Sequence, residues 1–187
     1  METYHLKVCG LTRELPYIPI DEHMAYASFV VLGDTELVVK AAKELAAMVK
    51  DADIVLTAEA KGIALAHEIT RNLGRKEFIV ARKSVKSYMQ DPIEEVLHSI
   101  TTNGEQRLYL DQCDVEKVRG KRVCLVDDVI STGESLQAME NLLHHVGAEV
   151  AYRLAILAEG KAADRKDITF LERLPLFRKT ENGYEAI

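Results

Sequence analysis

Two adjacent carboxylates stand between an apolar run and a turn of small residues, in the thirteen-residue segment from Val123 to Ser135. We expect the run 123–126 to be a buried strand that ends in Asp127 and Asp128, and the turn to open a helix. The N-terminus of a helix presents unpaired N–H groups and the positive end of the helix dipole, which favours a bound anion. Hydroxyl groups add donors, and glycine lets the backbone approach closely. The segment predicts a phosphate cup made of Ser131, Thr132, Gly133, Glu134 and Ser135.

Asp127 and Asp128 would repel a phosphate and therefore need another role. Adjacent carboxylates beside an anion site are suited to accepting hydrogen bonds from sugar hydroxyls, or to contacting a hydrated Mg²⁺ ion.

A locally basic stretch is the second feature that could do chemistry. Residues 71–86 contain six basic side chains and one acid, Glu77. Arg82 and Lys83 follow an apolar run, so we expect them at the strand edge that bears the ligand. Arg71, Arg75 and Lys76 lie near an expected helix C-terminus, where cations are favourable without any ligand.

Composition limits the classes of protein that these features can belong to. The chain has 187 residues, with 24 Lys and Arg against 30 Asp and Glu, for a net charge of −6. That charge offers no general attraction to nucleic acid or to an anionic membrane. No apolar run approaches the roughly 18–20 residues that span a bilayer, and the N-terminus lacks a signal peptide's basic region. We therefore expect a cytoplasmic protein without a nucleic-acid or membrane partner, with reduced cysteines at 9, 113 and 124.

Periodicity indicates the elements that must position these residues. Helical spacing of apolar residues is present over 36–49, 65–73 and 136–146, and Asp34 is a possible cap of the first helix. Short apolar runs predict buried strands at 54–56, 78–81, 123–126 and 150–157. Strands that alternate with helices predict a doubly wound α/β fold, with a parallel sheet covered on both faces, in one domain over residues 1–187.

Residues 84–106 interrupt this alternation because they show neither periodicity nor a long apolar run. A connection of that length is commonly a functional lid. Glu95 and His98 within it have the spacing of a helical metal pair, but no second pair accompanies them, and we expect a solvated loop. Residues 107–111 alternate like a half-exposed strand and predict a hairpin-like arm.

The segment 123–135 resembles, position by position, the phosphoribosyl pyrophosphate (PRPP) signature of type I phosphoribosyltransferases: four hydrophobic residues, two acids, two hydrophobic residues and a short Ser/Thr/Gly turn. The resemblance runs from about Leu15 to Phe177 and is strongest toward the adenine and xanthine enzymes. It places a pyrophosphate loop at 59–62, a basic strand end at 80–83 and a mobile catalytic loop at 84–106. It also implies a mostly parallel sheet with a loop arm and a small base-binding hood in about residues 1–35.

The resemblance implies an enzyme of purine salvage that transfers ribosyl 5-phosphate from Mg²⁺-bound PRPP to a purine base, with adenine as the expected base. Mg²⁺ would be held by pyrophosphate and water rather than by protein side chains, and the protein would be a homodimer. The cup would hold the 5-phosphate, and Asp127 and Asp128 the ribose hydroxyls. The implied pyrophosphate site is Glu59, Ala60, Lys61, Gly62, Arg82, Lys83, Lys86 and Tyr88; Phe29 would contact the base; the implied catalytic residues are Asp127, Asp128, Lys86 and Glu105.

The identity of the base stays open at this point. Adenine enzymes carry a Glu-Tyr-Gly segment after the mobile loop, where this chain has Thr102-Asn103-Gly104, so that Glu105 would have to supply the carboxylate. Xanthine enzymes have an amide side chain near the base where this chain has Val31. Orotate enzymes have a Lys-x-x-Lys-x-His-Gly motif, of which only Lys83 and Lys86 are present. A regulatory domain that binds PRPP as a signal is the alternative from another class.

Overall fold

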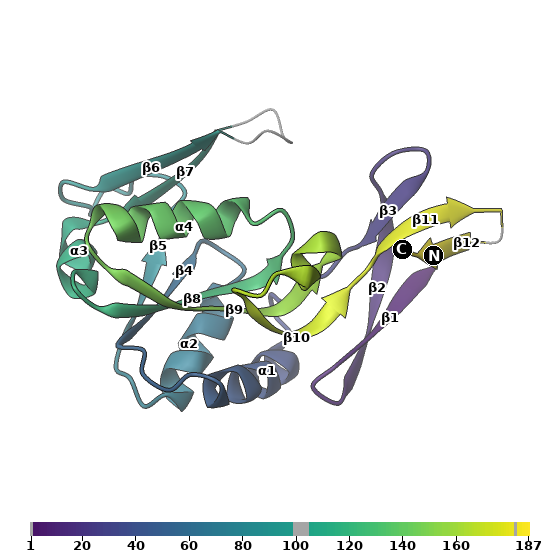
Figure 1. Ribbon diagram of the computed structural model, residues 1–187, viewed down its shortest axis with the longest axis horizontal. Coiled ribbons are helices and arrows are strands. Elements are labelled where there is room, and N and C mark those ends of the chain that lie inside the picture. Colours follow the sequence, from purple (N-terminus) through teal and green to yellow (C-terminus); the bar gives the residue numbers. More distant parts are fainter. Residues whose placement is uncertain (1, 99–104, 182) are drawn as a thin grey trace.

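A five-stranded parallel sheet forms the centre of the molecule in this computed structural model, which describes residues 2–98, 105–181 and 183–187, without the side chains of 97, 98, 105 and 106 (Figure 1). Its strand order is β10 (Thr169–Leu174), β9 (Glu149–Glu159), β8 (Arg122–Ile130), β4 (Ile54–Ala58), β5 (Phe78–Ala81). Every neighbouring pair is parallel. The α/β class with a parallel sheet, predicted from sequence, is confirmed.

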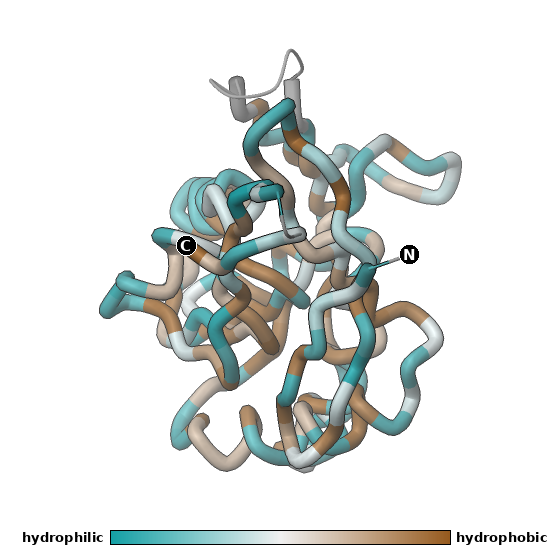
Figure 2. The backbone as a smooth tube through the Cα atoms, turned by 90° about the vertical axis from the view of Figure 1, so that its right-hand side faces the viewer, coloured by the Kyte–Doolittle hydropathy of each residue, from teal (hydrophilic) through white to brown (hydrophobic). Residues whose placement is uncertain are grey.

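Both faces of this sheet are buried, which is why its strands read as continuous apolar runs. In β8, Val123 and Leu125 pack into the core on one face, and Cys124 and Val126 into the core on the other. Helices α1 (Thr35–Ala47) and α2 (Ile63–Asn72) cover the second of these faces, and α3 (Gln112–Val118) and α4 (Glu134–His145) cover the first (Figure 1). In Figure 2 the mostly apolar strands cross the interior, and hydrophilic residues follow the outer turns.

The connections that leave β4 and β8 run to opposite faces of the sheet. These two strands are neighbours, yet α2 follows β4 on one face and α4 follows β8 on the other. The two chain segments therefore separate at the carboxyl ends of the strands, which is where open α/β sheets bind ligands. The expected helices and strands are present within a few residues, but β8 continues to Ile130. The expectation that this strand ends at Asp127 and Asp128 was wrong, because both acids lie inside β8, where Asp127 is opposite Ala155 of β9.

A second, antiparallel sheet lies at one end of the molecule (Figure 1). Its strand order is β1 (Thr3–Val8), β2 (Leu11–Pro19), β3 (Met24–Ala27), β11 (Leu176–Thr180), β12 (Gly183–Ala186). The segment expected as a hood thus forms one sheet with strands from the C-terminus, which the sequence analysis did not predict. Phe177 of β11 ties the two parts together, since its ring packs against the rings of Tyr4 and Tyr17 at centroid distances of 5.1 and 4.8 Å.

Strands β6 (Ile93–His98) and β7 (Glu105–Leu110) form the predicted arm as an antiparallel hairpin beside α4. The expectation of a solvated loop over 93–98 was wrong. The alternation of apolar and polar residues that marks a strand is absent from this segment, because the residue that faces inward is an acid. This residue, Glu95, is only 9% exposed. Its carboxylate accepts a hydrogen bond of 2.7 Å from Asn141 and lies 3.2 Å from His145, both on α4. Glu95 therefore docks the arm on the helix and is not half of a helical metal pair.

Asp34 joins the antiparallel sheet to α1. Its Oδ1 accepts a hydrogen bond of 3.1 Å from the Leu37 N–H, which caps the helix, and Arg13 of β2 donates to both carboxylate oxygens at 2.6 and 2.9 Å. The hydrogen bonds from Arg13 lower the pKa of Asp34. One side chain thus satisfies a free helix N–H and holds a strand on the helix end.

We predict that Asp34→Ala lowers the free energy of unfolding by about 1–2 kcal/mol, because both the cap and the ion pair are lost. Urea denaturation measures this loss. Glu36→Gln is the control, since Glu36 also pairs with Arg13 but is exposed and caps nothing, and it should cost less than about 0.5 kcal/mol. Because the folded pKa is lowered, the charge contributes stability above the usual Asp pKa of about 4, and this contribution disappears as the pH falls through the lowered value. The stability gap between wild type and Asp34→Asn should therefore close in acid; a gap that stays constant contradicts the assignment.

Candidate active site

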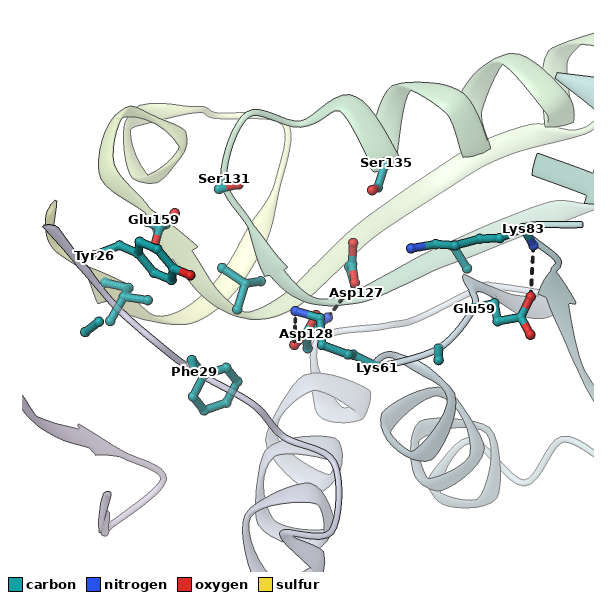
Figure 3. Close-up of a pocket in the computed structure, with 15 residues that line it drawn as sticks. Tyr26, Phe29, Glu59, Lys61, Lys83, Asp127, Asp128, Ser131, Ser135 and Glu159 are labelled. Carbon is teal, nitrogen blue, oxygen red and sulfur yellow. Dashed lines mark hydrogen bonds and ion pairs between the residues drawn. The ribbon is translucent and has the colours of Figure 1, made fainter. Parts of the chain in front are cut away.

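A cavity of about 420 Å³ opens where β4 and β8 separate (Figure 3). Its walls come from β3 and the segment after it, from the loop after β4, from the ends of β8, β9 and β10, and from the turn that opens α4. The lining residues are Tyr26, Ala27, Phe29, Ala58, Glu59, Ala60, Lys61, Lys83, Asp127, Asp128, Val129, Ser131, Ser135, Glu159 and Leu174. The cavity thus brings together residues from the whole length of the chain.

The two predicted acids lie in the middle of this cavity. Strand β8 pairs with β4 only as far as Val126, so Asp127 and Asp128 face the loop that follows β4. Asp128 is 1% exposed, and its Oδ2 lies 2.9 Å from Nζ of Lys61. Asp127 Oδ1 accepts a hydrogen bond of 2.8 Å from the Asp128 N–H. Burial, and then the adjacent Asp128 carboxylate, raise the pKa of Asp127. Lys61 thus compensates the charge of Asp128, whereas Asp127 forms no such ion pair with the described residues. The oxygens of this pair of acids can accept hydrogen bonds from hydroxyl groups.

Glu59 organises the cations at one end of the cavity. Its carboxylate accepts hydrogen bonds of 2.9 Å from the Lys83 N–H and 3.2 Å from Arg82 Nη2, and it lies 3.7 Å from Lys86 Nζ. The Lys83 N–H, and then Arg82, lower the pKa of Glu59. Arg82 Nη1 also donates to the Tyr88 hydroxyl at 2.8 Å. The structure therefore brings these predicted residues together, with Glu59 as the anchor of basic groups; a carboxylate itself does not bind an anion.

The turn 131–135 has the geometry of an anion site. Helix α4 begins at Glu134, and Gly133 before it has φ +82°, the left-handed region that favours glycine. The sequence analysis missed one residue here, Arg165. A Cβ at position 133 would lie 2.7 Å from Nη1 of Arg165, so this guanidinium flanks the turn. Arg165 stands in an irregular stretch after β9, and no sequence pattern connected it with the cup.

Aromatic and apolar groups line the end of the cavity that lies away from Glu59 and Lys83 (Figure 3). Phe29, the residue predicted to contact a base, is 7% exposed and belongs also to the core. Tyr26, Leu174 and Glu159 join it from β3, β10 and the end of β9. The sequence analysis missed these three, because the ends of strands from different parts of the chain meet only in the folded protein.

Several predicted residues lie elsewhere. Thr102, Asn103 and Gly104 fall outside the described residues, and Glu105 is described only by its backbone, at the start of β7. Arg71 pairs with Glu68 in the same helix, and Arg75 donates to the Ala52 carbonyl at 2.8 Å. As expected for cations at a helix end, neither lines the cavity.

Within the described ranges, no three His, Cys, Asp or Glu side chains are grouped to hold a metal ion. No helix in these ranges is long and apolar enough to cross a membrane. All three cysteines are free thiols; burial raises the pKa of Cys124 to about 12, whereas Cys113 is exposed.

We predict that Gly62→Ala destabilises the loop after β4. Gly62 caps α2 with an ordinary backbone, but a Cβ there would lie 2.2 Å from Oγ1 of the fully buried Thr57. The free energy of unfolding should fall by about 1–3 kcal/mol from overpacking. In a Thr57→Ala background, which removes Oγ1, the cost of the same change should be smaller by about 1 kcal/mol or more. Chemical denaturation of the four proteins measures this coupling, and strictly additive costs would contradict the assigned contact.

Three comparisons place the chain among known proteins. The model of the phosphoribosyl transferase domain family matches residues 31–174. The chain is 36% identical over 110 residues to adenine phosphoribosyltransferase of Thermotoga petrophila, covering 59% of this chain and 61% of that one. It is 32% identical over 112 residues to hypoxanthine/guanine phosphoribosyltransferase of Methanothermus fervidus, covering 60% and 55%. The matched parts thus span less than two thirds of the length of these relatives.

A solved structure shares the fold. The crystal structure of adenine phosphoribosyltransferase from Thermoanaerobacter pseudethanolicus superposes with a TM-score of 0.66 at 20% sequence identity, covering 86% of this chain and 95% of that one.

Proposed function

We propose that this chain, which belongs to the phosphoribosyl transferase family, is an enzyme that transfers ribosyl 5-phosphate from PRPP to a purine base, with adenine as the expected base. One observation carries the proposal: a single cavity is lined by serines of the turn that opens α4, by a central acid pair, and by Lys61, Lys83 and Glu59, with Arg82 and Lys86 paired to Glu59 behind its wall. PRPP has a phosphate, a ribose and a pyrophosphate in the same order. Relatives named as adenine and hypoxanthine/guanine phosphoribosyltransferases support a purine as the acceptor.

The 5-phosphate would bind at residues 131–135. N–H groups at the start of α4 point at the anion, and the helix dipole favours its charge. Hydroxyl groups of Ser131, Thr132 and Ser135 add donors. Arg165, which lies beside Gly133 and pairs with Asp167, would add a donor group at the same end. These groups hold one end of the donor and fix the position of its ribose.

Asp127 and Asp128 would accept hydrogen bonds from the ribose hydroxyls. Bonds of this kind to an ionised carboxylate are roughly twice as strong as bonds between neutral groups. Mg²⁺ bound with the donor would supply positive charge beside this acid pair. Asp127, whose pKa is raised in the free protein, would then be favoured in its ionised, accepting form.

Cations at the other end would stabilise the leaving group. In the reaction the bond between the anomeric carbon and the pyrophosphate oxygen breaks, a bond from that carbon to a purine nitrogen forms, and the proton on this nitrogen leaves. Negative charge grows on pyrophosphate in the transition state. Arg82 and Lys86, which pair with Glu59, and Lys83, whose side chain lines the cavity, would act where that charge grows, and this is the condition for accelerating the reaction.

Residues 84–106 are proposed as the segment that closes over the bound donor and excludes water, which would otherwise hydrolyse the activated sugar. The contact of Lys86 with Glu59 supports a place beside the leaving group. The homodimer and the cytoplasmic location stay predictions, as do the roles of Tyr88 and Glu105.

The proposal predicts that purified protein with Mg²⁺ and PRPP converts a purine base to its nucleoside monophosphate and releases pyrophosphate. A radiolabelled-base assay across adenine, hypoxanthine, guanine, xanthine and orotate measures this, with protein lacking Mg²⁺ as the control. Turnover of orotate alone would contradict the purine assignment. Binding of PRPP by calorimetry without turnover of any base would instead indicate a PRPP-sensing domain.

We predict that Asp127→Asn lowers kcat/KM by at least about a hundredfold, while stability stays equal or rises. The folded pKa of Asp127 is raised, so the wild type loses stability as the pH rises above about 4 toward that value. The advantage in unfolding free energy of Asp127→Asn should therefore grow with pH over this interval. Asp114→Asn, on α3 outside the cavity, is the control and should change kcat/KM less than about twofold. An Asp127→Asn enzyme with the kcat/KM of wild type would remove this acid from the mechanism.

A further inference from the structure

Glu159 is a carboxylate in the cavity that the proposed reaction does not yet use. It is the last residue of β9 and lines the cavity, beside Tyr26 in Figure 3. In the part of the chain that the structure describes, no hydrogen bond or ion pair joins its side chain to another residue. The positive charge of Lys61 acts on it, but the Nζ of Lys61 lies 2.9 Å from Asp128 and is paired there. The carboxylate of Glu159 is therefore partly buried without a bonded partner.

The surroundings of Glu159 are suited to a flat apolar ring. Leu174 is the strand partner of Glu159, and Phe29 lies at the same end of the cavity (Figure 3). Leu174 and Phe29 are 1% and 7% exposed. Asp127 and Asp128 lie between this end and the cations around Glu59 (Figure 3). A base that reaches the ribose from the side opposite the pyrophosphate therefore enters the part of the cavity that holds Glu159.

A carboxylate in such a place demands hydrogen-bond donors. When ionised it only accepts hydrogen bonds, and burial without a donor is costly. Burial accordingly raises the pKa of Glu159. A ligand that brings N–H groups removes this cost, whereas a ligand that brings a carbonyl oxygen places two acceptors face to face.

We propose that Glu159 is the specificity residue for the base and accepts a hydrogen bond from the exocyclic amino group of an aminopurine. This inference rests on the proposed function and deepens it. Adenine carries that group on C6 and guanine on C2, whereas hypoxanthine has none. The site therefore favours an aminopurine over hypoxanthine, and the position of the amine decides between the two aminopurines.

The test compares kcat/KM for adenine, guanine and hypoxanthine in wild type and in Glu159→Gln, which keeps the shape and removes the charge. Wild type should prefer adenine or guanine to hypoxanthine. Glu159→Gln should reduce this preference at least about tenfold, the loss of one hydrogen bond to a charged group, while KM for PRPP stays within about twofold. Glu116→Gln, an exposed residue of α3 outside the cavity, is the matched control and should leave every ratio unchanged.

A second measurement does not depend on the variant. Calorimetric titration of wild type with ribose 5-phosphate present should show tighter binding of adenine, or of guanine, than of 6-methylpurine and hypoxanthine. Equal affinities would overturn the inference. A wild-type preference for hypoxanthine would also overturn it. So would an equal loss of kcat/KM with all bases in Glu159→Gln, together with a changed KM for PRPP. That result would make Glu159 an electrostatic partner of Lys61. No transfer of any base by wild type refutes the proposed function itself, whereas transfer with unchanged ratios refutes only the role of Glu159.

Discussion

The separation of two neighbouring parallel strands is the constraint from which the rest of this site follows. Strands β4 and β8 pair side by side, but the helices that follow them pack on opposite faces of the sheet. The backbone beyond them cannot continue the sheet, so the loop after β4 and the turn before α4 leave a cavity between them. Every group that could hold a ligand reaches the cavity from one of these strand ends or from an element packed beside them.

The local arrangement of charged side chains, and not the net charge of the chain, determines what the cavity can bind. The chain carries a net charge of −6, yet the cavity is lined by Lys61 and Lys83 as well as by acids, and Arg82 and Lys86 pair with Glu59 in its wall. Each acid that faces a cation constrains it: Asp128 holds Lys61, and Glu59 holds Arg82 and Lys86. Basic side chains fixed in this way lose less freedom when an anion binds. The acids thus hold the basic side chains in place for an anionic ligand, although an acid by itself would repel that ligand.

Both sheets contribute to the apolar end of the cavity. Tyr26 comes from β3 of the antiparallel sheet and Phe29 from the segment after it, whereas Glu159 and Leu174 are the last residues of β9 and β10 in the parallel sheet. Strands from both ends of the sequence build the antiparallel sheet. This end of the cavity therefore exists only where the two sheets meet.

The sequence by itself determined the parallel sheet, its covering helices and the residues that lie on consecutive stretches of chain. Apolar runs and helical spacing report burial directly, so 123–135 and the basic strand end at 82–83 could be assigned from the residues themselves. The loop 59–62 and Lys86 were assigned by the resemblance to the family. Only the tertiary structure decided the rest. The strand at 93–98 was not predicted because its inward residue is Glu95, and the burial of this acid depends on Asn141 and His145 of α4. Arg165 and Glu159 could not be predicted, because the residues they lie near are far from them in the sequence. Arg165 flanks Gly133, and Glu159 lines the cavity at the end that holds Phe29. Local pattern records which side of an element is buried, but contacts between the ends of distant strands exist only once the sheets have packed.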